Sequence, residues 1–162
     1  MRSAIRKKTA MLGILVFVMV FASIVYSHCQ IPCGIYGDPA RFDMIAENIT
    51  TIEKSMRQIT ELSQKNKPNF NQIVRWVQNK EKHADELSYV VTYYFMAQRI
   101  KPAGNTKGKT YEEYVKKLTL LHEMLVYSMK AKQTTDLSNV EKLKSVLAEF
   151  RAVYFDKYSH EH

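Results

Sequence analysis

Residues 38–62 read DPARFDMIAENITTIEKSMRQITEL, and this stretch decides the fold. Its apolar residues recur at steps of three and four positions, at Phe42, Ile45, Ile49, Ile52, Met56, Ile59 and Leu62. This spacing places one apolar stripe along one face of an α-helix. Asp38 followed by Pro39 predicts an N-cap and a proline at the first helical position. The helix is therefore amphipathic, and its stripe must be buried against other elements.

Further segments of the chain show the same helical period. The second carries apolar residues at Ile73, Val74, Val77, Ala84, Leu87, Val91, Tyr94 and Phe95, and it ends before the Pro- and Gly-containing loop 101–105. The third and fourth open with the S/T-x-x-E pattern of a capping box, at Thr110 to Glu113 and at Ser138 to Glu141. Four amphipathic helices joined by short loops predict an all-α fold, an antiparallel four-helix bundle that forms one domain over residues 28–162.

Residues 1–27 have the features of a leader. The basic residues Arg6, Lys7 and Lys8 precede an uncharged, mostly apolar stretch over 9–27. Val25 and Ser27 suit the −3 and −1 positions of a signal-peptide cleavage site, which predicts His28 as the mature N-terminus. An uncleaved membrane anchor is the alternative, because about 20 apolar residues span a bilayer.

The charge distribution argues against nucleic-acid binding. The chain has 24 Lys and Arg against 16 Asp and Glu, a net charge of +8. Four of the basic residues lie in the leader, which has no acidic residue, so residues 28–162 carry a net charge of +4. No basic cluster with the geometry of a nucleic-acid site is present, and we expect no nucleic-acid partner. Membrane contact is expected through the leader alone, if it is not cleaved.

The residues that can carry chemistry are concentrated in 28–36, HCQIPCGIY, which we name the hook. It contains both cysteines of the chain, Cys29 and Cys33. A Cys29–Cys33 disulfide in a secreted or membrane-anchored helical binding protein is one interpretation, because export leads to an oxidising compartment. The spacing matches neither a C-x-x-C redox motif nor a paired zinc knuckle.

Cleavage before His28 favours a metal site instead. The free α-amine, the deprotonated amide of Cys29 and the Cys29 thiolate close two fused five-membered chelate rings around one metal. The Cys33 thiolate takes the fourth corner, and the His28 imidazole reaches an axial position. A planar N₂S₂ set favours Ni(II) or Cu(II) over zinc, magnesium or manganese.

The hook and the four helices that follow it resemble nickel superoxide dismutase over essentially the whole of residues 28–162. The resemblance rests on H-C-x-x-P-C-G-x-Y at a mature N-terminus. It implies disproportionation of superoxide to dioxygen and hydrogen peroxide at a Ni(II)/Ni(III) site with one nickel ion per subunit. It further implies that His28, Cys29 and Cys33 are the metal ligands, that Tyr36 guards the approach to the metal, and that Tyr94 is a second tyrosine of that path.

This sequence departs from the family pattern at several positions. Gln30 stands where well-known members have Asp, and Gly37 is inserted before the first helix. The resemblance implies a glutamate and an arginine that hold the axial imidazole, a common device for orienting a metal-bound histidine. Asp43 and Glu47 are candidates for the glutamate, and His83 for the arginine.

The resemblance also implies partners and a location. Superoxide is the expected substrate, and a homohexamer is the expected assembly. The leader predicts export to the periplasm or the extracellular space; a membrane-anchored form, or a cytoplasmic form after leader removal, is the alternative.

Overall fold

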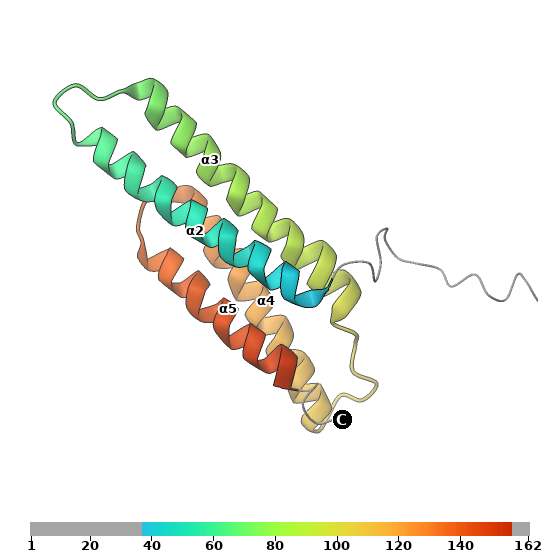
Figure 1. Cartoon of the computed structure of the whole chain (residues 1–162). Helices are drawn as coiled ribbons and strands as arrows, with labels where there is room; N and C mark the ends of the chain where they lie inside the picture. Colours follow the sequence, from blue (N-terminus) through green and yellow to red (C-terminus); the bar gives the residue numbers. More distant parts are fainter. Residues whose placement is uncertain (1–36, 157–162) are drawn as a thin grey trace, which may run out of the picture. The chain divides into compact units, whose positions relative to one another are not determined.

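The computed structural model describes residues 37–156, drawn in colour in Figure 1. The chain divides into two compact units, residues 1–33 and 34–162, and the described residues belong to the second. The predicted leader and hook lie outside the described residues. The elements are α2 (Asp38–Ser63), α3 (Phe70–Tyr89), the π-helix η1 (Val90–Arg99), α4 (Lys109–Gln133) and α5 (Ser138–Asp156).

The helices form an all-α bundle in which each neighbour in sequence is also a neighbour in space. Helix α2 packs against α3 and α5, and α4 packs against the same two helices (Figure 1). Short loops join the helices, so consecutive helices run in opposite directions. Residues 37–156 contain no β-strand. The predicted antiparallel four-helix bundle is confirmed.

The stripe of α2 lies in the core as its spacing predicts. Phe42, Ile45, Ile49, Ile52 and Met56 are all at most 1% exposed. Around Phe42 the core is aromatic, and the Phe42 ring centroid lies 4.9, 5.3 and 5.4 Å from the centroids of Phe95, Phe150 and Tyr154. Aromatic pairs at these distances add to the stabilisation from buried apolar area. The first turns of α2 are thereby packed against η1 and α5.

The predicted helix starts are wrong by about one residue. Asp38 is the first helical residue rather than the N-cap, which is Gly37. Helix α4 begins at Lys109, one residue before Thr110, and its N-cap Gly108 has a φ of 92°, a left-handed conformation that glycine tolerates. Before α5 the Asp136 carboxylate accepts the Ser138 backbone N–H and hydroxyl, so the predicted Ser138 cap is replaced by Asp136.

The second predicted helix differs from the structure in two ways. It changes to π-helical geometry at Val90 and continues to Arg99. Val74 and Val77, expected in the apolar face, are 53% and 37% exposed. The start of α3 packs on α2 through another face, where Asn79 donates to the Ser55 hydroxyl at 3.0 Å. Helical spacing shows that a face is apolar, but not which side a neighbouring helix covers.

A buried lysine fastens α3 to the end of α4. Lys80 is 4% exposed, and its Nζ donates to the carbonyl oxygens of Lys132 at 2.5 Å and Thr134 at 3.1 Å. These carbonyls lie at the C-terminus of α4, where a cation is favoured. Lys80→Met should therefore lower the free energy of unfolding by about 1–3 kcal/mol, because two carbonyls lose their donor.

Urea unfolding measures this loss, and Lys82→Met is the matched control. Lys82 pairs with Glu86 at 3.6 Å, and its side chain is 71% exposed. Surface pairs of this kind contribute about 0–1 kcal/mol. Equal destabilisation by the two variants would refute the role assigned to Lys80.

None of the helices within residues 37–156 is both long enough and apolar enough to cross a membrane.

Candidate functional site

A polar cluster binds the start of α2 to two other elements. The Asp38 carboxylate accepts hydrogen bonds on Oδ1 from Tyr94 Oη at 2.5 Å and from Arg99 Nε at 2.8 Å. Its Oδ2 accepts from Tyr154 Oη at 2.7 Å. Tyr94 and Arg99 belong to η1, and Tyr154 belongs to α5. We name these four residues the Asp38 cluster.

The π-helix brings two members of the cluster together. Arg99 Nη2 donates to Tyr94 Oη at 2.9 Å, and its guanidinium carbon lies 4.7 Å from the centre of the Tyr94 ring. The two residues are five positions apart, and i→i+5 pairing is the repeat of a π-helix. The widened turn of η1 thus allows the Tyr94 hydroxyl and the Arg99 guanidinium to donate to the same carboxylate, that of Asp38.

The charges of the cluster are matched at neutral pH. Burial raises the pKa of the Asp38 carboxyl, but hydrogen bonds from Tyr94 and Tyr154 and the charge of Arg99 outweigh burial, so its net pKa is lowered. Burial and the hydrogen bond to Asp38 raise the pKa of Tyr94. Burial opposes the charge of Arg99, but Tyr94 and Asp38 raise its net pKa. The cluster therefore holds a carboxylate, a neutral phenol and a guanidinium.

This arrangement makes a pH-dependent contribution to stability. At pH 7, Asp38→Asn should lower the free energy of unfolding by about 1–3 kcal/mol, because charge-assisted hydrogen bonds are lost. The folded pKa of Asp38 lies below the ordinary value of 3.8. The wild-type protein therefore has its full excess of unfolding free energy over Asp38→Asn when the pH is above the ordinary pKa of Asp. This excess disappears as the pH falls through the lowered pKa of the folded protein.

Urea unfolding of both proteins between pH 7 and pH 2 measures this difference. A difference in unfolding free energy that stays constant over the whole range would contradict an ionised Asp38 in the folded protein.

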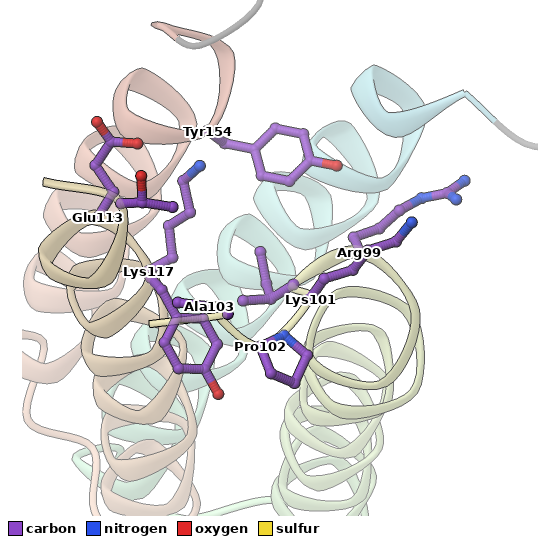
Figure 2. A pocket seen from close by; sticks show the side chains of 11 residues that line it. Arg99, Lys101, Pro102, Ala103, Glu113, Lys117 and Tyr154 are labelled. Atoms are coloured by element: carbon purple, nitrogen blue, oxygen red, sulfur yellow. The ribbon is translucent and has the colours of Figure 1, made fainter. Parts of the chain in front are cut away.

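A cavity of about 370 Å³ lies beside the cluster. Arg99 and Tyr154 line it together with Lys101, Glu113 and Lys117. Figure 2 shows the Lys117 side chain extending toward Tyr154, and Lys117 Nζ lies 5.9 Å from the centre of the Tyr154 ring. Lys101 and Lys117 against Glu113 give the lining a positive excess, which favours small anions, whereas the charge of Arg99 is matched by Asp38.

The predicted metal ligands and the predicted gate lie outside the described residues. These are His28, Cys29, Cys33 and Tyr36. Tyr94, predicted as the second tyrosine of the access path, is 8% exposed and belongs to the Asp38 cluster. Its hydroxyl donates to Asp38 and accepts from Arg99, so the hydroxyl is held in place at the start of α2.

The structure places the three candidates for holding the axial histidine in separate contacts. Asp43 is at the surface, where its Oδ1 accepts from Arg151 at 3.2 Å. Glu47 is exposed, and its backbone carbonyl accepts the Thr51 hydroxyl. His83 Nδ1 lies 2.7 Å from the side-chain oxygen of Asn48. Their predicted role near the metal stays a prediction.

Sequence reasoning missed Arg99 and Tyr154 as members of a site. Tyr154 is one of the buried residues of α5, and its polar tip was the available signal, because buried tyrosine hydroxyls require a partner. The partner Asp38 is 116 residues away along the chain. No local pattern connects residues at that separation.

Within residues 37–156, no three His, Cys, Asp or Glu side chains are grouped so that they could hold a metal ion.

Comparison with known proteins identifies the family. The family model described as nickel-containing superoxide dismutase matches residues 23–158, which include the hook and all the helices described above. No curated protein and no solved structure matches the chain. The family match covers most of the sequence and agrees with the helical bundle. The chain therefore belongs to the nickel-containing superoxide dismutases, and it is an oxidoreductase that uses nickel to disproportionate superoxide.

Proposed function

We propose that the active enzyme begins at His28, after removal of residues 1–27, and holds one nickel ion per subunit through His28, Cys29 and Cys33. The family match supports the nickel site, because it spans the segment that contains both cysteines. The alternative of a helical binding protein with a Cys29–Cys33 disulfide is not favoured, because the matched family is an enzyme family.

The donors of the hook fit nickel by their chemistry. Two thiolates, an amidate and an amine form a strong-field, sulfur-rich set, which Ni(II) accepts in tetragonal geometry. An α-amine has a pKa of about 7.7–8.0, so a neutral lone pair is accessible near neutral pH. An acylated nitrogen has no such lone pair. Removal of the leader is therefore required before the proposed site can form. Bound nickel supplies one-electron redox chemistry, which thiolate and amidate donors bring into range of superoxide.

Residues other than the ligands restrict access to the metal, attract small anions and orient the Asp38 carboxylate. Tyr36 limits access to the metal ligands, which protects the thiolates from oxidation by peroxide. The positive lining of the cavity, with Lys101 and Lys117, raises the local concentration of small anions such as superoxide near the start of α2. The Tyr94 and Tyr154 hydroxyls donate hydrogen bonds to Asp38 and thereby hold its carboxylate in one orientation.

We further propose that the subunits assemble as a homohexamer and that the protein is exported. Large exposed side chains support assembly: Tyr89 and Tyr93 are 59% and 48% exposed and stack on each other with centroids 4.6 Å apart. Aromatic side chains are enriched at protein interfaces. Residues 1–27 support export to the periplasm or the extracellular space, and an uncleaved membrane anchor is the alternative.

Elemental analysis read beside N-terminal sequencing tests the proposal. One nickel per chain with His28 as the first residue is the expected result. Active protein that retains Met1, or a metal-free product with a Cys29–Cys33 disulfide, would overturn it. Sedimentation of the same material measures the assembly, for which six chains are expected.

A further inference from the structure

The processed chain attaches its metal ligands to the bundle at a single place. When His28 is the first residue, the hook has a free end, and its covalent connection to the helices runs through Gly37 into Asp38. Cys33 is five residues before Asp38, so the backbone alone permits a separation of up to about 18 Å. Metal sites require ligands held to within about 0.5 Å. The covalent connection through Gly37 alone therefore does not fix the ligands relative to α2.

Asp38 is the first residue of α2 and lies two residues after the end of the hook. Its carboxylate is 18% exposed and is held on Oδ1 by η1 and on Oδ2 by α5. Restraint of both oxygens by two different elements fixes the side chain in direction as well as in position. Arg41 lies over the Tyr94 ring at 5.2 Å, which adds a further contact from α2 to the cluster.

A second carboxylate of α2, that of Glu53, provides a comparison for Asp38. Glu53 is 19% exposed, and it pairs with Arg57 of its own helix at 2.6 Å and with Lys144 of α5 at 2.7 Å. Glu53 matches Asp38 in charge, burial and contact with α5, but it lies 15 residues further along the helix. The two carboxylates differ in their distance from the hook along the chain and in their partners, because Glu53 pairs with its own helix and α5 whereas Asp38 is held by η1 and α5.

We propose that Asp38 is a positioning residue for nickel binding: the Asp38 cluster fixes the direction in which the chain leaves α2 and so restricts the conformations of the hook. This inference rests on the proposed function, because it takes His28, Cys29 and Cys33 as the ligands. Outer contacts that orient metal ligands typically change metal affinity by about 10–100-fold.

The test compares three variants of the processed protein: Asp38→Asn, Tyr154→Phe and the matched control Glu53→Gln. The first readout is the rate at which excess EDTA removes nickel from the folded protein. The second is hydrogen exchange of the backbone amides of residues 34–38 in the metal-free protein. Circular dichroism establishes that each variant keeps its helices, and Tyr154→Phe covers the case in which Asp38→Asn does not fold.

Asp38→Asn should release nickel about 10-fold faster than the wild-type protein. Tyr154→Phe should change the rate in the same direction by a smaller factor, and Glu53→Gln should leave it unchanged. Exchange of the amides of 34–38 should increase in the first two variants and not in the control.

Two results separate the failure of this inference from the failure of the proposed function. A wild-type protein that starts at His28 and holds no nickel defeats the proposed function, and the inference with it. A wild-type protein that holds nickel, with Asp38→Asn and Glu53→Gln equal in nickel release, defeats the positioning role alone.

Discussion

Cys33→Ser is expected to abolish nickel retention and dismutation while the helical bundle stays folded. A serine hydroxyl does not ionise near neutral pH and is a hard donor, whereas nickel in this donor set requires the soft thiolate. The buried core described here is formed by residues between Phe42 and Tyr154, so the substitution changes none of the residues that form it. Nickel content by elemental analysis, superoxide consumption and circular dichroism measure the three effects. We expect activity at the background level and unchanged helicity.

Tyr36→Phe is the contrasting variant for this experiment. It changes a residue of the hook but leaves every proposed ligand intact, so it should keep one nickel per chain. A Cys33→Ser protein that retained stoichiometric nickel, or a Tyr36→Phe protein that lost it, would contradict the ligand assignment.

One alanine added before His28 should reduce superoxide consumption as strongly as Cys33→Ser does. The added residue converts the donor amine of His28 into an amide, and the new amine lies one residue away. The neutral amine donor beside the Cys29 amidate and thiolate is then lost, because the His28 nitrogen has become an amide nitrogen. Superoxide consumption should fall to background in the extended protein, although its helices and both cysteines are unchanged. Rapid-mixing measurement of superoxide decay checks the result.

The same alanine inserted after Asn66 is the control. Asn66 lies in the exposed loop between α2 and α3, away from the cavity, and such loops tolerate insertions. The control should keep its nickel and its activity. Normal turnover by the protein extended before His28 would be incompatible with a site that uses the amine of that residue.

The helical bundle was predictable because its evidence is local. The stripe from Phe42 to Met56 repeats with the period of a helix, and burial of one face is a property of that period. Helix ends were predicted less accurately, since capping depends on a single backbone turn. Ser138 was taken as a cap, but the Asp136 carboxylate performs that role from two residues earlier.

The proposed ligands also rest on local sequence, and their assignment stays a prediction. An amine, an amidate, two thiolates and an imidazole come from the short segment between His28 and Cys33, so their chelation follows from covalent spacing. The exposed face of α3 was not predictable in this way. Val74 fits the apolar pattern of its helix, yet it is 53% exposed, because the neighbouring helices cover another side.

By itself, the sequence determined that this protein is a bundle of amphipathic helices, and it predicted a metal-binding segment in front of the first one. Both properties depend on residues a few positions apart. The tertiary structure alone decided that Asp38 is held by Tyr94, Arg99 and Tyr154 rather than capping its own helix. These partners are 56 to 116 residues away, and only the packing of η1 and α5 against α2 brings them within hydrogen-bonding distance of one carboxylate.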